Sequence, residues 1–157
     1  MNAVDPSSSI LITDEPIACD MALARFTERA KGAGAIVSFI GLVRDQRTDQ
    51  TVTGLELQHY PGFTEKQIAR FCEMAYARWS LADFQIIHRV GTMTPHDAIV
   101  FVSTAAVHRR AAFEACDFLM DYLKSEAPFW KKEYRNGEAV WIEPRAEDHI
   151  DKQRWES

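Results

Sequence analysis

Three different periodicities follow one another with almost no linker in the C-terminal half of the sequence. A β-branched and aromatic run at residues 99–105 predicts a strand, and the amphipathic segment 107–125 predicts a long helix that Pro128 ends. Asn136-Gly137, a pair favoured in two-residue hairpin turns, then lies between two short β-rich runs. Such a close alternation of strands and helix predicts an α+β fold with mostly antiparallel strands.

The N-terminal half extends the same alternation. We expect the order αββαββαββ in a single domain of residues 10–157, preceded by a flexible leader at residues 1–9. The polar segment 44–50 is predicted to be a mobile loop, and the charged tail after Arg145 is predicted to be solvated. The predicted helices are 14–30, 64–79 and 107–125, and the predicted strands are 35–43, 53–59, 84–90, 99–105, 129–134 and 139–143, with a turn at 91–97.

Composition and charge restrict the class of protein. With 157 residues, of which 46% are hydrophobic, the chain can bury a core without disulfides. Its three cysteines lack a CxxC spacing, which indicates reduced thiols and a cytoplasmic protein. No apolar run is long enough to span a membrane, and the N-terminus lacks the pattern of a secretory signal. The net charge of −5 argues against nucleic-acid binding, so any functional positive charge must be locally concentrated.

Cations and apolar side chains share one face of the predicted helix 107–125. On a helical wheel, Arg109, Phe113, Met120 and Lys124 fall within a single stripe. Because burying an unpaired charge is costly, this stripe is expected to line a cleft or an interface. Arg109 and Lys124 are fifteen residues apart, or about 22 Å of straight helix, so they cannot hold one small group together. They would bracket an extended ligand or serve sites completed by different chains, which suggests a dimer.

Two further lysines follow Pro128 on a predicted strand. Successive side chains of a strand point to opposite faces, so only one of Lys131 and Lys132 should join Lys124. Phe129 and Trp130 would wall such a site and lower its dielectric. A lysine in these surroundings can have a pKa that falls toward neutrality, which would make it a usable general acid or base.

The remaining candidates have simpler interpretations beside the functional ones. Arg44 lies where a strand feeds a polar loop, a common place for functional groups, and no Cys/His cluster has the spacing of metal ligands, so no metal site is expected. Lone surface cations are, however, usually solvated, and a histidine at a helix start often makes only local hydrogen bonds. Phe39, Met120 and Cys116 are of types that more often pack in a core. Residue chemistry alone thus predicts an α+β domain with a candidate anion site.

Several segments resemble one enzyme family in combination. They are GAIVSFIGLVRD (34–45), LELQHYPGFTEKQI (55–68), the long run from IIHRVGTMTPHDAIVFVSTAAVHRRAAFEA through DYLKSEAPFWKKE (86–133), and WIEPR (141–145). They occur in order and span most of residues 34–145 without a large gap. The chain resembles the large, catalytic subunits of molybdopterin synthase.

The resemblance implies an α/β-hammerhead-type fold and a homodimer within a heterotetramer. Each subunit would bind a small ubiquitin-like sulfur-carrier subunit, whose C-terminal Gly-Gly tail carries a thiocarboxylate. The reaction would insert two sulfurs into cyclic pyranopterin monophosphate and so form molybdopterin, with no metal or organic cofactor. The alternative from another functional class is a non-catalytic module that binds a ubiquitin-like tail or an anionic metabolite.

The resemblance also implies roles for particular residues. The functional lysines of the family fall on Lys124 and Lys131, and we expect one to orient the carrier terminus and the other to act as general acid/base, in either assignment. Candidates for a phosphate clamp, with one group from the neighbouring subunit as an option, are Arg44 and His108-Arg109. The remaining positions implied as substrate-binding are Arg145, Phe39 and Met120.

Overall fold

The computed structural model describes residues 9–156 as a mixture of nine strands and four helices. The predicted leader lies outside the described residues except for Ser9, which is buried and accepts a hydrogen bond from the Gln85 side chain on its backbone oxygen. The elements in chain order are β1 Ile10–Thr13, α1 Cys19–Arg29, β2 Ala35–Leu42, β3 Gln46–Arg47, β4 Gln50–His59, α2 Phe63–Trp79, β5 Asp83–Arg89, β6 Gly91–Met93, β7 Ala98–Ala106, α3 Arg109–Ser125, β8 Phe129–Arg135, β9 Glu138–Ile142 and α4 Ala146–Gln153.

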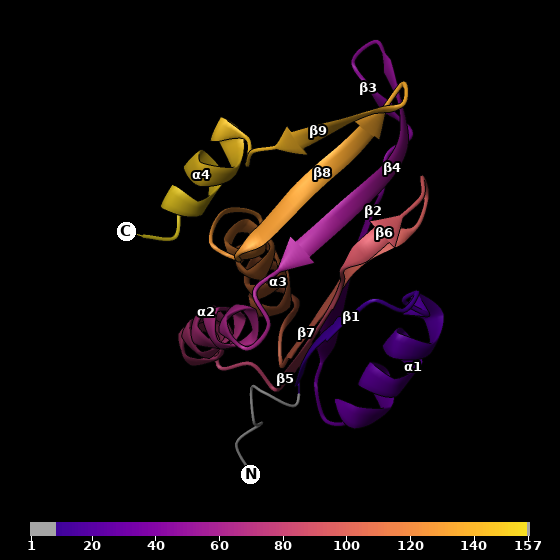
Figure 1. The fold of residues 1–157 in the computed structure, drawn as a ribbon. Coiled ribbons are helices and arrows are strands. Elements are labelled where there is room, and N and C mark those ends of the chain that lie inside the picture. Colours follow the sequence, from indigo (N-terminus) through magenta and orange to yellow (C-terminus); the bar gives the residue numbers. More distant parts are fainter. Residues whose placement is uncertain (1–8, 157) are drawn as a thin grey trace.

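The strands form two sheets that lie at an angle to each other (Figure 1). The first has the order β1-β5-β7-β2, in which only the β1–β5 pair is parallel. The second has the order β3-β4-β8-β9, with β6 also paired to β4, and all its pairs are antiparallel. The prediction of an α+β fold with mostly antiparallel strands is confirmed.

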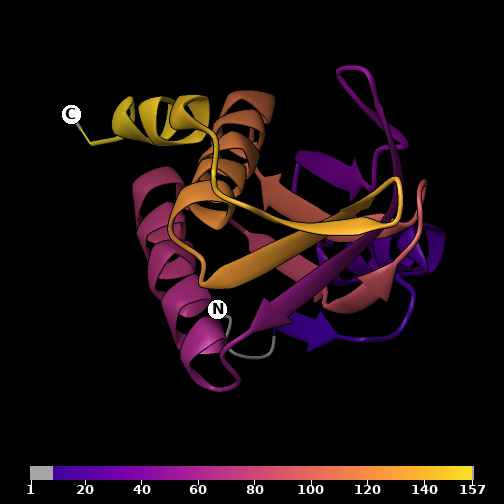
Figure 2. The ribbon, with the colours of Figure 1, turned by 45° about the horizontal axis from the view of Figure 1, so that its top comes forward.

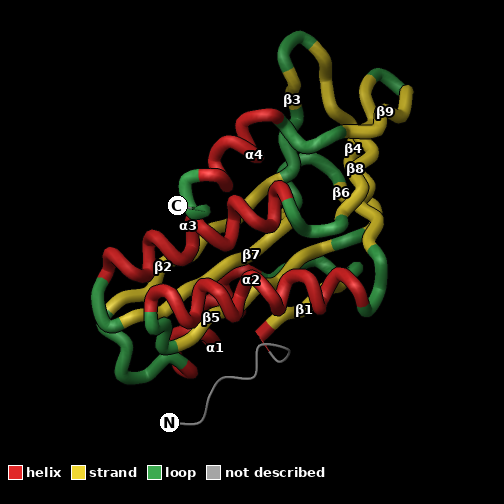
Figure 3. The backbone as a smooth tube through the Cα atoms, turned by 90° about the vertical axis from the view of Figure 1, so that its left-hand side faces the viewer, coloured by secondary structure: helices red, strands yellow, loops and turns green. Residues whose placement is uncertain are grey.

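The four-stranded sheet is covered on both faces. Helices α2 and α3 lie across the same face, as Figure 3 shows, and α1 lies on the other (Figure 2). Alternation along β7 explains this arrangement, because Val100 and Val102 enter the main core while Ala105 contacts the small cluster around Phe26 of α1. Of the helices described within residues 9–156, none combines the length and apolarity needed to cross a membrane.

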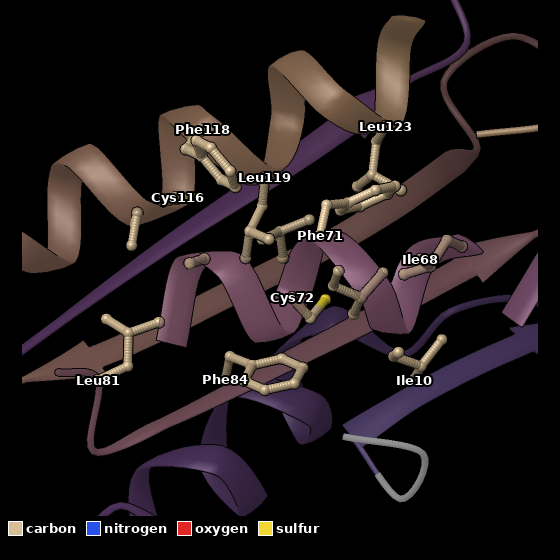
Figure 4. Packing of buried hydrophobic residues seen from close by; sticks show 14 of the residues in the cluster. Ile10, Ile68, Phe71, Cys72, Leu81, Phe84, Cys116, Phe118, Leu119 and Leu123 are labelled. Carbon is tan, nitrogen blue, oxygen red and sulfur yellow. The ribbon is translucent and has the colours of Figure 1, made fainter. Parts of the chain in front are cut away.

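The main core lies between α2, α3 and the sheet. Phe118, Leu119 and Leu123 of α3 point toward Phe71 and Cys72 of α2 (Figure 4). Each such large side chain, once removed from water, contributes about 1.5–3 kcal/mol to folding. This packing fixes the orientation of α3 relative to the sheet, and so places both ends of that helix. Burial also raises the pKa of the Cys116 thiol to about 12, which agrees with a packing role rather than a nucleophilic one.

Four regions of the chain differ from the prediction. The chain pairs with β5 as far as Thr13, and Val90 N–H donates to the Thr13 oxygen, so the first helix begins at Cys19 rather than near Asp14. The predicted mobile loop 44–50 contains β3, which pairs back on β4. The predicted turn 91–97 contains β6. The tail after Arg145, predicted to be solvated, contains helix α4, which packs on α3.

Candidate functional site

Five of the predicted site residues, Phe39, Arg44, Lys124, Lys131 and Arg145, line a cavity of about 540 Å³ between the end of β2, the last turn of α3, strand β8 and the start of α4. Cations outnumber carboxylates among its charged lining residues. Its charged lining residues are Arg44, Arg47, Lys124, Lys131, Arg145, Glu133, Glu143 and Asp148, and Phe39, Leu42, Val52, Leu55, Ile99 and Ile142 are among its apolar ones.

Pairing of β8 selects which lysine enters the cavity. Lys131 lies opposite Leu57 on β4 and Ile142 on β9, and its side chain lines the cavity beside Lys124. Lys132 points to the other face of the sheet, where its ammonium lies over the Trp141 ring and 4.0 Å from the Glu56 carboxylate. The structure therefore brings Lys124 and Lys131 together and separates Lys132 from them.

Both lysine side chains line the same cavity, and the positive charge of Arg44 acts on both of them. Burial, together with the positive charge of Lys124, lowers the pKa of Lys131 to about 8. Burial also lowers the pKa of Lys124, although Asp148 opposes this effect. With a pKa of about 8, Lys131 has a neutral amine that is populated near neutral pH.

Arg145 and Asp148 carry opposite charges into the same cavity. The Asp148 carboxylate is 8% exposed and accepts hydrogen bonds from the backbone N–H of Arg145 at 3.1 Å and from its Nη2 at 3.2 Å. Burial raises the pKa of Asp148, but the hydrogen bonds from Arg145 outweigh it and hold the pKa below its usual value. Asp148 is therefore ionised, and it lines the same cavity as both lysines.

A smaller apolar cavity of about 110 Å³ adjoins the first. Phe39, Lys124 and Lys131 line both cavities, and Met120 lines the smaller one, which is called the inner cavity. His88 also lines it, with its ring stacked on Phe129 at 4.0 Å between centroids and its Nδ1 donating to the Arg89 oxygen at 3.0 Å. Burial lowers the pKa of His88 to about 3, so the ring is neutral. The inner cavity is thus a mostly apolar pocket that both lysines also line.

His108 and Arg109 lie elsewhere. They stand at the opposite end of α3 and line a separate surface hollow of about 420 Å³ with Arg110, Phe113 and Glu114. Phe113 is 61% exposed and Arg109 is exposed as well, so this end of the charged stripe of α3 does not face the core. The cavity of about 540 Å³ that Lys124 and Lys131 line is called the lysine cavity below. Within one chain, the structure does not bring His108 or Arg109 to it.

The sequence analysis does not single out several residues around the two lysines. Glu133 and Asp148 line the lysine cavity, and His88 lines the inner cavity beside it. Asp148 was assigned to a solvated tail, although an acidic residue three positions after Arg145 fits a helix start and was a usable signal. In the part of the chain that the structure describes, no group of three or more His, Cys, Asp or Glu side chains is placed to hold a metal ion.

The arrangement can bind an anion and move a proton. Arg44 and Arg145 present guanidinium groups at the cavity wall, which suits oriented hydrogen bonds to a phosphate or carboxylate. Lys124 can hold a negative charge close to Lys131, whose amine can accept or return a proton. These groups meet in an enclosure with apolar walls, where electrostatic interactions are stronger than in water.

Comparison with known proteins connects this geometry to one family. Residues 12–126 match the family described as "MoaE protein". The chain is 48% identical to the molybdopterin synthase catalytic subunit of Caulobacter vibrioides, over 94% of this chain and 97% of that one. It is 52% identical to the protein of the same name from Vibrio cholerae, over 79% and 83%. The solved structure of molybdopterin cofactor biosynthesis protein E from Burkholderia multivorans superposes with a TM-score of 0.79 at 39% identity, over 95% of this chain and 97% of that one.

Proposed function

The chain belongs to the MoaE protein family, and from this premise we propose that it is the catalytic subunit of a molybdopterin synthase, acting in molybdenum cofactor biosynthesis. The reaction transfers two sulfurs from the thiocarboxylate terminus of a small carrier subunit to cyclic pyranopterin monophosphate. The observation that carries the proposal is the Lys124–Lys131 pair, with its lowered pKa values, in a cavity that also presents Arg44 and Arg145.

The two lysines take different roles in this proposal. Lys124 retains its proton and orients the anionic carrier terminus, which enters along the apolar inner cavity past Phe39 and Met120. Lys131 has the lower pKa and serves as the general acid/base when sulfur attacks the pterin carbon.

A phosphate clamp requires groups from two subunits. Arg44 and Arg145 lie in the lysine cavity, whereas His108 and Arg109 lie at the far end of α3. We assign His108 and Arg109 to the lysine cavity of a second copy in a homodimer, and the small carrier completes a heterotetramer. The free edge of the four-stranded sheet supports self-association, since β2 exposes Phe39, Ile40 and Leu42 there.

Reconstitution with a thiocarboxylated carrier and cyclic pyranopterin monophosphate tests the function. Wild-type protein should form molybdopterin, and Lys124→Ala and Lys131→Ala should each lose most turnover while keeping the fold. Lys132→Ala is the matched control, because Lys132 is the neighbour of Lys131 on β8 but points to the other face of the sheet. Carrier binding without product in the wild type would instead support a non-catalytic binding module.

A further inference from the structure

The C-terminal end of the described chain is fastened to α3 by three donors on one carboxylate. The Trp155 indole Nε1 donates to Asp121 Oδ2 at 2.6 Å, and Arg154 donates to the same oxygen through Nη2 at 2.8 Å and through Nε at 3.3 Å. Asp121 is a buried residue. A buried carboxylate without such partners would be strongly destabilising, so this contact commits the tail to α3.

Aromatic packing and a second helix strengthen the same attachment. The Trp155 ring meets Trp79 of α2 and Phe118 of α3 edge-on, with centroids 5.5 and 5.7 Å apart. Arg78 of α2 donates to the Trp155 backbone oxygen at 2.8 Å. The far end of α4 is thereby held by two helices of the main core.

The near end of α4 lies in the lysine cavity. Asp148 is in the first turn of this helix, where the helix dipole favours a negative charge, and Arg145 immediately precedes the helix. Asp121 and Lys124 are three residues apart on α3, so they share one side of that helix. The same helix therefore carries both the catalytic lysine and the anchor of the segment that supplies Asp148.

Three carboxylates line the lysine cavity, and Asp148, although it also accepts hydrogen bonds from Arg145, is the one whose charge acts on both lysines. Lys131 of β8 faces Lys124 of α3, Arg44 after β2 and His88 of β5, while Arg145 also faces Lys124. The other buried acid of the cavity, Glu133, already pairs with two arginines, Arg47 at 3.4 Å and Arg135 at 2.7 Å, and Glu143 is exposed on the rim.

We propose that Asp148 is the counter-ion of the Lys124–Lys131 pair and that its negative charge favours the protonated form of both amines. Helix α4 is then a clamp, and the positioning residues Arg154 and Trp155, which follow it, hold Asp148 in the lysine cavity. The role in turnover rests on the proposed function, but the ionisation of the lysines does not. Asp148 raises the pKa of both lysines against the effect of burial. Loss of its charge therefore lowers both pKa values, and neutral amine appears at lower pH.

The test measures lysine ionisation without substrate. The rate of acetylation of each lysine by acetic anhydride, read by peptide mass spectrometry across pH, gives the midpoint of its deprotonation. We expect Asp148→Asn to lower the Lys131 midpoint by about one pH unit, a typical effect of removing an adjacent opposite charge. Below the midpoint the reactive fraction of Lys131 then rises about tenfold. Lys132 in the same peptide region is the internal reference.

The clamp is tested by a milder change. Trp155→Phe keeps an aromatic ring but removes the N–H that reaches Asp121, and should shift the Lys131 midpoint in the same direction by a smaller amount. Asp148→Asn combined with Trp155→Phe should shift it no further than Asp148→Asn alone. Ile150→Ala, on the exposed side of α4, is the matched control and should leave the midpoint unchanged. Thermal melting establishes that each variant is folded, and Asp148→Ser replaces the Asn variant if that one is not.

The outcomes separate the two proposals. A Lys131 midpoint that is the same in wild type and folded Asp148 variants would overturn the counter-ion role, whatever the activity. An Asp148 shift without any Trp155 shift would overturn the clamp. A shifted midpoint in a protein that forms no molybdopterin with thiocarboxylated carrier would sustain the inference about α4 and sink the proposed function.

Discussion

The two ends of α3 differ in how completely the chain surrounds them. At the C-terminal end, Lys124 meets Lys131 and Asp148, groups that come from β8 and α4. At the N-terminal end, Arg109 and His108 lie in an open hollow beside the exposed Phe113, and within residues 9–156 neither forms an ion pair. One end is an assembled site, whereas the other presents cations and an aromatic ring that this chain leaves uncovered.

The helix dipole makes the difference more informative. A lysine in the last turn is favoured by the partial negative charge of the C-terminus, whereas cations in the first turn oppose the partial positive charge of the N-terminus. The first turn of α3 contains no acidic residue. Cations at this position lower the stability of the isolated subunit. Binding of an anion by these cations and by the backbone N–H groups of the first turn would offset that loss. We therefore expect a site to be active only when the C-terminal end of α3 in one subunit faces the N-terminal end of α3 in a second subunit.

Removing the proton-transfer group should have the largest effect and would sharpen the role of the assembled end. Lys131→Arg retains a positive charge but has a guanidinium that stays protonated, so turnover should fall about 10²- to 10⁴-fold, the usual contribution of a general acid/base. In wild type, turnover should rise as pH passes through about 8, because the neutral Lys131 amine then accumulates. Measured pH–rate profiles in which turnover falls across this range would contradict its role as the base.

Mixed dimers test whether the two ends meet between subunits. Arg109→Ala should reduce turnover about 10- to 100-fold, the loss expected for a charge-assisted hydrogen bond to the substrate. Coexpression of Arg109→Ala with Lys124→Ala should restore about a quarter of wild-type turnover, because half of random dimers are mixed and each has one intact site.

The matched control is coexpression of Lys124→Ala with Lys131→Ala. These residues line the same cavity of one chain, so no mixed dimer has an intact site and turnover should stay low. Equal recovery in the two mixtures would rule out the arrangement between subunits.

The elements and residues that could be predicted from the sequence are those whose placement depends on local signals. Helix α3 and the β8–β9 hairpin were found because periodicity and Asn136-Gly137 are local signals. Whether Lys131 or Lys132 enters the cavity depends on the pairing of β8 with β4, which the spacing of the lysines does not contain. The placement of Arg109 far from Lys124 followed from helix geometry, so the sequence already indicated that the two residues bracket an extended ligand or serve sites completed by different chains.

Elements held by distant contacts were missed. Strand β1 has four residues and pairs in parallel with a strand more than seventy residues away. Helix α4 is mostly polar, and its order comes from Trp155 packing on Trp79 and Phe118 and from Asp121 accepting its hydrogen bonds. Because these interactions are tertiary, the charge pattern of the tail predicted solvent exposure. Asp148 lies in this tail and was therefore not predicted as a site residue.

Acid should destabilise the assembled end through His88. The folded-state pKa of about 3 lies below the unfolded value near 6.5, so the unfolded chain binds the extra proton and stability declines as pH falls from about 6.5 toward 3. At pH 5 this amounts to about 2 kcal/mol. His88→Phe, which can keep the stacking on Phe129, should lose that part of the pH dependence in urea unfolding at pH 7.5 and pH 5. An unchanged difference between the two pH values would show that His88 is not the responsible group.

The smallest effect concerns the uncovered end and has the opposite sign. Arg109→Glu places an anion in the first turn of α3, where the helix dipole favours it, and should raise the free energy of unfolding of the subunit by about 0.3–1 kcal/mol. Arg70→Glu makes the same change of charge at an exposed position in the middle of α2, away from both ends of that helix, and should have less effect. The variant should nevertheless lose turnover, because an anion at this position repels a phosphate. Urea unfolding at low ionic strength measures the gain in the free energy of unfolding. A loss of stability instead would mean that Arg109 already has a stabilising partner within the subunit, and that the N-terminal end of α3 does not need one from a second copy.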